Sequence, residues 1–84
     1  MYFVYMLECA GGGLYTGITT DVKRRFAEHV RGVGGYYTRA HVPKRVVYVE
    51  QQQGRSLASR QEAAIKKLSR AQKLDLIKSH AALG

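Results

Sequence analysis

The chain opens with a continuous run of apolar and aromatic residues, Tyr2-Phe3-Val4-Tyr5-Met6-Leu7, which favour β-strands. Because no polar residue alternates with the apolar ones, the run predicts a strand that is covered on both faces. The remaining sequence must therefore supply a covering layer on each side. With 84 residues there is room for one domain, residues 1–84, with a small core.

A second strand is predicted directly after the first. Gly11-Gly12-Gly13 makes a turn, and residues 14–19 are expected to return as a hairpin that sets Tyr5 near Tyr15. Thr20 or Asp21 then caps a helix that runs to about residue 31. This helix carries its apolar stripe at Val22, Phe26 and Val30.

The second half of the chain predicts one more strand and two more helices. Residues 31–43 contain too many helix and strand breakers for a regular element, and a third strand follows, centred on residues 46–49 and ended by Gly54. Ser56 or Ser59 begins the second helix, and Ser69 with Gln72 forms a capping box that opens the last one. The expected inward residues are Leu57, Ala64, Ile65 and Leu68, then Leu74, Ile77 and Ala81.

The element order ββαβαα predicts an α+β fold, a small three-stranded antiparallel sheet flanked by three helices. Charge indicates the partner: 14 Lys and Arg against 6 Asp and Glu give a net charge of +8, which suits a polyanion. So few acids exclude a carboxylate cage for a hard cation. The lone Cys9 excludes a disulfide or zinc ribbon within the chain and fits a reducing, cytoplasmic setting, and no apolar run is long enough for a membrane span.

Several residues outside this plain framework are candidates for chemistry. Tyr5 and Tyr15 on paired strands are either core residues with satisfied hydroxyls or members of a site, and Gly17 is a bulge or a close-approach glycine. Arg25 and His29 share one helix face beside the apolar stripe. They are either a stacked arginine with a hydrogen-bonded histidine or a phosphate-binding guanidinium with an orienting imidazole.

Glu62 also has more than one interpretation. It is a capping-box partner of Ser59, an i,i+4 partner of Lys66, a solvated side chain, or a magnesium ligand whose shell is completed by phosphate oxygens. Its angle from the expected apolar stripe argues against burial.

The loop before the third strand mixes aromatic and cationic side chains. Tyr36, Tyr37 and Arg39 suit stacking on unpaired bases and contact with phosphates, unless the loop is an ordinary surface segment with an aromatic plug. Lys66 and Lys67 form a solvated face that adds electrostatic attraction for a nucleic acid.

Taken together, these residues resemble the GIY-YIG nuclease domain, specifically the small stand-alone bacterial proteins of the YhbQ-like, or URI, subgroup. The resemblance covers residues 1 to about 78. Phe3-Val4-Tyr5 stands where the family has GIY, and Tyr15-Thr16-Gly17 stands where it has YIG. The helix segment containing Arg25 and His29, the Tyr37-Thr38-Arg39 tripeptide and the run from Glu62 to Arg70 follow in the family's order.

The resemblance implies an endonuclease that hydrolyses a phosphodiester with one divalent metal, Mg²⁺ or Mn²⁺. Tyr5 would take a proton from the attacking water or position it, and Tyr15 would share in orienting the water. His29, Tyr15, Arg25 or a bound cation would favour the phenolate. Arg25 would hold the scissile phosphate, Glu62 would bind the metal, and Gly17 would permit close backbone approach. The chain departs from the family at Phe3 and Val4, and it contains no asparagine to match the C-terminal one of several members.

The expected substrate is DNA rather than RNA, single-stranded, branched or damaged as in DNA repair. A chain this short has no separate sequence-reading domain, so little sequence specificity is expected, and the protein is expected to act as a monomer. Two rival functions use the same features: a non-catalytic nucleic-acid-binding module on this fold, and an adaptor whose basic surface meets an acidic protein.

Overall fold

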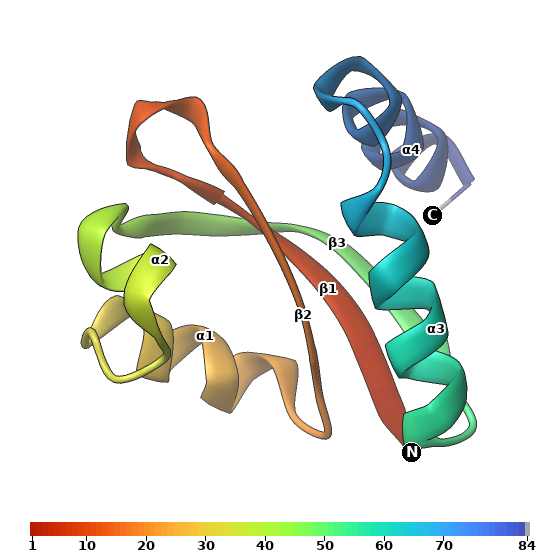
Figure 1. Ribbon diagram of the computed structural model, residues 1–84, viewed down its shortest axis with the longest axis horizontal. Helices are drawn as coiled ribbons and strands as arrows, with labels where there is room; N and C mark the ends of the chain where they lie inside the picture. The colour runs from red at the N-terminus through yellow and green to blue at the C-terminus, as the bar shows by residue number, and fades with distance from the viewer. Residues whose placement is uncertain (84) are drawn as a thin grey trace.

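A computed structural model describes residues 1–83, and their backbone forms a three-stranded antiparallel sheet with helices on both faces (Figure 1). The strands are β1 (Tyr2–Cys9), β2 (Leu14–Thr19) and β3 (Pro43–Gln52), in the spatial order β2-β1-β3. The helices are α1 (Val22–Val30), α2 (Tyr36–Ala40), α3 (Arg55–Lys66) and α4 (Arg70–Leu83), with a 3₁₀ helix, η1, at Ala10–Gly12. The predicted α+β class and antiparallel sheet are confirmed.

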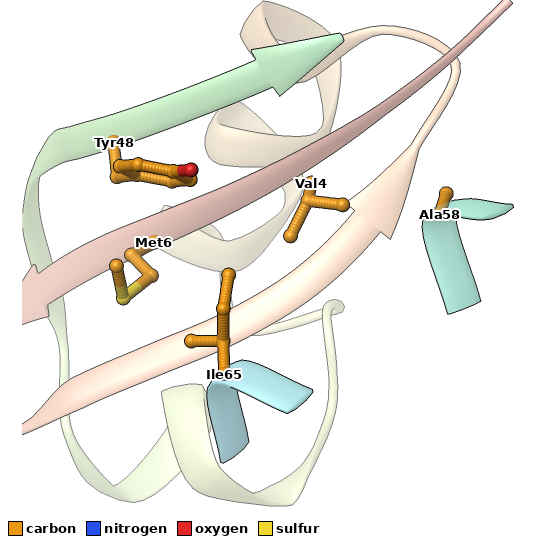
Figure 2. Close-up of a cluster of buried hydrophobic side chains, with 5 residues drawn as sticks. All are labelled: Val4, Met6, Tyr48, Ala58 and Ile65. Atoms are coloured by element: carbon orange, nitrogen blue, oxygen red, sulfur yellow. The ribbon is translucent and has the colours of Figure 1, made fainter. Parts of the chain in front are cut away.

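The central position of β1 explains its continuous apolar sequence. Val4 and Met6 face α3 and form a core with Tyr48, Ala58 and Ile65 (Figure 2). The alternate residues of β1 point to the opposite face, where they pack against α1. These residues are Tyr5, Leu7 and Cys9, with Val22 and Phe26 of α1 against them. A strand covered on both faces was the prediction from the first residues, and the sheet order confirms it.

The two strands of the hairpin pair in a register that differs slightly from a direct Tyr5–Tyr15 pair. Tyr5 lies opposite Gly17, and Leu7 lies opposite Tyr15. The two tyrosines are therefore diagonal neighbours on one face, with ring centroids 6.3 Å apart. This places a residue without a side chain directly across from Tyr5.

Local caps begin α1 and α4 as predicted. The Asp21 carboxylate accepts a hydrogen bond from the Arg24 N–H at 3.0 Å. Ser69 and Gln72 exchange bonds of 3.2 and 2.9 Å in a reciprocal capping box. Both interactions join residues three positions apart, so they need no tertiary contact to form.

One predicted irregular segment contains a helix. Residues 31–43 include the short helix α2, which the glycines before it obscured in the sequence. Gly32 and Gly35 adopt positive φ of 82° and 133°, a region open to glycine, and so turn the chain between α1 and α2. The observed order is therefore ββααβαα, with α2 added to the three longer helices.

The inward faces of α3 and α4 also differ from the prediction. Ala58 and Ile65 are the buried residues of α3, while Leu57 and Ala64 are exposed. Each exposed residue precedes a buried one by one position, a rotation of 100°. The helix begins at Arg55, so Ser59 lies inside it and does not cap it.

Helix α4 turns Leu76 and Ile77 toward the core and leaves Leu74 and Ala81 exposed. Similarly, Val30 of α1 is exposed at the end of its stripe. No helix within residues 1–83 combines the length and the apolar character that crossing a membrane requires.

Candidate active site

Tyr5 is the centre of the candidate site, and Gly17 makes room for it. A Cβ at position 17 would lie 2.7 Å from the Tyr5 hydroxyl oxygen and 3.1 Å from a ring carbon of Tyr15. The Tyr5 ring thus passes over Gly17 toward β2, the edge strand of the sheet. The predicted close approach at this glycine is present, and it is made by a tyrosine of the protein itself.

His29 joins Tyr5 from α1. The Tyr5 hydroxyl and His29 Nε2 are 2.8 Å apart, and both side chains are buried, with exposures of 1% and 0%. This hydrogen bond is compatible with both interpretations of His29, the hydrogen-bonded histidine beside the core and the orienting imidazole of a site. The Tyr15 ring meets the imidazole edge-on, with centroids 4.9 Å apart.

Thr38 of α2 fixes the other side of the imidazole. Its Oγ1 lies 2.8 Å from His29 Nδ1 and donates to the Gly35 carbonyl at 3.5 Å. Since a hydroxyl has one proton to donate, Thr38 Oγ1 accepts the proton of Nδ1–H. Nε2 is then the unprotonated nitrogen, so Tyr5 donates its hydroxyl proton to it. The bonds run in one direction, from Tyr5 to His29 to Thr38 to the Gly35 carbonyl.

Gly34 closes the space beside the imidazole. A Cβ at this position would lie 2.0 Å from His29 Nδ1 and within 2.7 Å of two further ring atoms. The backbone of the α1–α2 loop therefore packs directly on the ring. Only a residue without a side chain leaves the imidazole where it bonds both Tyr5 and Thr38.

Burial determines the protonation of this pair. Burial, and then the neighbouring Tyr15, raise the pKa of Tyr5 above its usual range, while the Arg25 guanidinium opposes them. Burial and the Arg25 charge lower the pKa of His29, and Glu28 opposes this more weakly. In the free protein Tyr5 is accordingly a neutral phenol and His29 a neutral imidazole, in agreement with the direction of their hydrogen bond.

Arg25 lies at the entrance to this buried pair. Its guanidinium bonds the Glu28 carboxylate at 3.0 Å and the Gly34 carbonyl at 3.0 Å. It also lines an open cavity of about 310 Å³ between α1 and the beginning of α3. The side chain is thus held at two points, and it remains one-third exposed, within reach of a ligand.

Glu62 is less exposed than its predicted position on α3 indicated. The rotation of α3 that buries Ala58 and Ile65 turns Glu62 toward the sheet, and its side chain is 24% exposed. Its carboxylate pairs with Lys66 at 3.4 Å, one of the expected alternatives. Its charge is also the smallest of the causes that raise the pKa of Tyr5.

Residues 1–83 contain no cluster of three His, Cys, Asp or Glu side chains that would hold a metal by themselves. Mg²⁺ commonly binds through one or two carboxylates plus substrate phosphates. Glu62 fits that donor set, because it offers one partly exposed carboxylate whose ion-pair partner is a single exposed lysine, Lys66.

The aromatic residues of the loop divide into two groups. Tyr37 stacks on Tyr15 with centroids 5.9 Å apart and contacts His41 at 4.6 Å, so it extends the aromatic cluster of the site. Tyr36 is 90% exposed, and Arg39 lies 6.0 Å from its ring centroid. Tyr36 and Arg39 also line a second open cavity, of about 450 Å³.

The two lysines at the end of α3 lie apart from the buried pair. Lys66 and Lys67 are both exposed, and Lys66 reaches back to Glu62. The structure therefore brings Tyr5, Tyr15, Gly17 and His29 into direct contact, with Arg25 beside them. Among the described residues, Glu62, Tyr36, Arg39 and the two lysines form no hydrogen bond or ion pair with this centre.

Thr38 and Gly34 were not identified as site residues from the sequence. Thr38 lay within the tripeptide that resembles the family, but no residue pattern links it to His29, nine positions earlier. Gly34 stood among other loop glycines. The available signal was a glycine a few residues after a histidine that is predicted to lie beside the core, and it became specific only once the loop was placed.

Comparison with known proteins identifies the family of this chain. The family model described as the GIY-YIG catalytic domain matches residues 1–75. A UPF0213 protein of Cupriavidus pinatubonensis is 49% identical over 73 residues, covering 87% of this chain and 81% of its own. A UPF0213 protein of Streptococcus agalactiae is 47% identical over 78 residues, covering 93% and 89%.

Among solved structures, the solution NMR structure of a UPF0213 protein from Bacillus halodurans is similar, with a TM-score of 0.59 and 43% identity. The match covers 93% of this chain and 84% of that one. Sequence and fold therefore indicate the same family. This chain belongs to the GIY-YIG nuclease family, in the group of small UPF0213 proteins.

Proposed function

We propose that this protein is a metal-dependent endonuclease that hydrolyses phosphodiester bonds in single-stranded or structured DNA with little sequence specificity. The observation that carries the proposal is the directed chain of hydrogen bonds from Tyr5 through His29 to Thr38. A buried, neutral imidazole that accepts a hydrogen bond from a phenol can take the proton of that phenol. Packing in the core alone does not require a histidine to bond a tyrosine and a threonine beside a partly exposed arginine.

Arg25 binds the scissile phosphate in this proposal. Its two contacts, with Glu28 and with the Gly34 carbonyl, hold the guanidinium in place and so reduce the entropy lost when substrate binds. Guanidinium hydrogen bonds to phosphate oxygens strengthen as negative charge develops on them. Arg25 therefore acts chiefly on the transition state.

Tyr5 and His29 together remove the proton of the attacking water. A standing phenolate at Tyr5 is disfavoured, because burial raises its pKa. A coupled transfer avoids that species: the water proton moves to the Tyr5 oxygen as the Tyr5 proton moves to His29 Nε2. The water oxygen forms its bond to phosphorus, the bond to the leaving 3′ oxygen breaks, and His29 is left as the imidazolium.

Thr38 keeps this transfer directed. By accepting from Nδ1–H, it holds His29 in the tautomer whose Nε2 faces Tyr5. Tyr15 packs against both rings and orients the water beside them. Gly17 leaves the space that the Tyr5 hydroxyl occupies.

Glu62 would hold the divalent metal, Mg²⁺ or Mn²⁺, together with oxygens of the substrate. Such an ion, when bound, neutralises the charge on the leaving 3′ oxygen. Because Lys66 pairs with the free carboxylate, the lysine must release it when the ion binds. The ion pair is exposed at Lys66, so this release costs little.

Substrate preference follows from the open surface around Tyr36. A tyrosine exposed at 90% with an arginine near its ring offers a stacking surface for an unpaired base. Paired bases of an intact duplex do not present their faces. Single strands, flaps and damaged sites are therefore the expected substrates, with Arg39, Lys66 and Lys67 contributing phosphate attraction.

The test is a panel of labelled single-stranded, duplex and branched DNAs and an RNA strand, incubated with Mg²⁺, Mn²⁺ or EDTA. Wild-type protein should cut the unpaired DNAs only with metal. Arg25→Ala, Tyr5→Phe and Glu62→Gln should still shift the substrate while cutting at least about 100-fold more slowly. Asp75→Asn, an exposed acidic control on α4, should cut normally.

Two results would contradict the proposal. Substrate that is shifted but uncut under every metal condition would make the protein a non-catalytic nucleic-acid-binding module. Full metal-dependent cutting by Glu62→Gln would remove Glu62 from the metal site.

A further inference from the structure

Three arginines from two segments that are distant in the sequence line the cavity of about 310 Å³. Arg24 and Arg25 come from the first turn of α1, and Arg55 is the first residue of α3. Tyr2 and residues 18–20 at the end of β2 complete the wall. In Figure 1 the end of β2 lies between the beginning of α1 and the beginning of α3, so both helices begin at the same end of the sheet.

The charges in this cavity are unequal. Glu28 is the only carboxylate among the lining residues, and it bonds Arg25. Within residues 1–81, the part whose side chains are described, neither Arg24 nor Arg55 forms an ion pair. Asp21 is nearby, but it caps α1 through the backbone N–H of Arg24. Two guanidinium groups are therefore available to an anion.

The size of the cavity limits that anion. At about 310 Å³ it lies at the lower end of the range of ligand pockets, about 300–1,000 Å³. This volume suits two neighbouring phosphates of one strand and the sugar between them. A duplex or a folded acidic peptide is too large to enter. Arginine is also the side chain best suited to phosphate, because it donates several hydrogen bonds in a fixed plane.

We propose that Arg24 and Arg55 form a second phosphate site, which binds the phosphate next to the scissile one on the same nucleic-acid strand. The site rests on the proposed function, since Arg25 in the same cavity is assigned to the scissile phosphate. Arg24 adjoins Arg25 in sequence, and Arg55 faces them from α3. One strand then passes between the two helices, and two successive phosphates are held before cleavage.

This site gives Arg24 a role that the sequence did not predict. On a helical projection Arg24 points away from the apolar stripe and is expected to be solvated. It is indeed exposed, but it faces the cavity at the beginning of α1. The neighbouring segment that turns this exposed arginine into part of a site is α3, thirty residues further along the chain.

The test compares short DNA ligands that differ by one phosphate. The dinucleotide dTpdT carries one phosphodiester, and its 5′- and 3′-phosphorylated forms carry a second phosphate on either side. Binding is followed by NMR in EDTA, through the arginine side-chain Nε–Hε signals. For wild-type protein at least one phosphorylated form should bind about tenfold more tightly than dTpdT and should shift the Arg24 and Arg55 signals.

Variants separate a specific site from general attraction. Arg24→Ala and Arg55→Ala should each lose most of the tenfold gain, while their affinity for dTpdT changes little. Arg60→Ala removes the same charge from an exposed position of α3 outside the cavity, and it should keep the gain. All three arginines are exposed, so the variants should fold, and circular dichroism verifies this.

The outcomes distinguish this site from the proposed function. If neither added phosphate improves wild-type binding, or if Arg24→Ala and Arg55→Ala keep the gain as Arg60→Ala does, the second phosphate site is wrong. The binding measurement needs no metal and no turnover. A tenfold gain that depends on Arg24 and Arg55, in a protein that cuts nothing, would support the site and overturn the nuclease proposal alone.

Discussion

Replacing Gly34 with alanine is expected to break the hydrogen bonds of His29, although Gly34 itself takes no part in them. The added Cβ would lie 2.0 Å from His29 Nδ1, whereas ordinary van der Waals contact begins at 3.4 Å. The difference, 3.4 − 2.0, requires a relative movement of about 1.4 Å. Nδ1 is the atom that bonds Thr38 at 2.8 Å, so such a movement takes this bond beyond hydrogen-bonding distance.

Two effects of this change lower the free energy of unfolding, and one smaller effect raises it. An imidazole N–H that is buried and loses its acceptor costs about 1–3 kcal/mol. Overpacking in a filled interior costs about 1–3 kcal/mol more. The alanine also restricts the unfolded chain, which returns about 0.4–1 kcal/mol. The expected loss of unfolding free energy for Gly34→Ala is therefore about 1–6 kcal/mol.

Urea unfolding, extrapolated linearly to water, measures this loss. Gly54→Ala is the matched control, because Gly54 has an extended φ of −153° and a Cβ there would meet nothing within 4 Å. The control should stay within about 0.5 kcal/mol of wild type. If Gly34→Ala were as stable as the control and cut DNA at the wild-type rate, the close packing of Gly34 on His29 would be refuted.

Three further predictions concern the same centre. Thr38→Val keeps the shape of the side chain but leaves His29 Nδ1–H without an acceptor, so it should lower the unfolding free energy by about 1–3 kcal/mol. Thr38→Ser should restore the unfolding free energy, and equal stabilities of the two variants would contradict the assigned bond. Because burial lowers the pKa of His29, the unfolded chain takes up a proton that the folded protein does not. The unfolding free energy should therefore fall below about pH 6.5, by at most about 1.4 kcal/mol per pH unit, and His29→Gln should flatten that dependence while a variant of exposed His41 should not. Gly17→Ala would place a Cβ 2.7 Å from the Tyr5 hydroxyl oxygen, so cleavage should drop roughly 10- to 100-fold while DNA binding in gel-shift assays persists; unchanged cleavage would count against the placement of Tyr5.

Much of the candidate site could be predicted from the sequence, because its members lie on regular elements. Tyr5 and Tyr15 come from strands whose hairpin is short, so their register has few alternatives. Arg25 and His29 are four residues apart on one helix, and the 100° rotation per residue puts them on one face. The element order, the antiparallel sheet and the caps at Asp21 and Ser69 likewise depend on neighbours in the chain.

The rotation of α3 could not be predicted with the same certainty. Leu57, Ala58, Ala64 and Ile65 are apolar residues on adjoining faces, and either pair of faces could turn inward. Packing against Val4 and Met6 of β1 selects Ala58 and Ile65, because the small alanine lets the helix approach the sheet. That choice also decides how far Glu62 turns toward the site.

The sequence by itself determined the three strands and the three longer helices, since strand pairing, helix periodicity and capping act over short distances along the chain. It did not determine α2 or the inward faces of α3 and α4. The tertiary structure alone decided which of those side chains meet. It brought Thr38 of α2 onto His29 and placed Gly34 beside the ring. It also set Arg55 opposite Arg24 across one cavity. These contacts depend on the positions of a glycine-rich loop and of α3. Those positions are stabilised by burial of the core, which side chains from several segments build together.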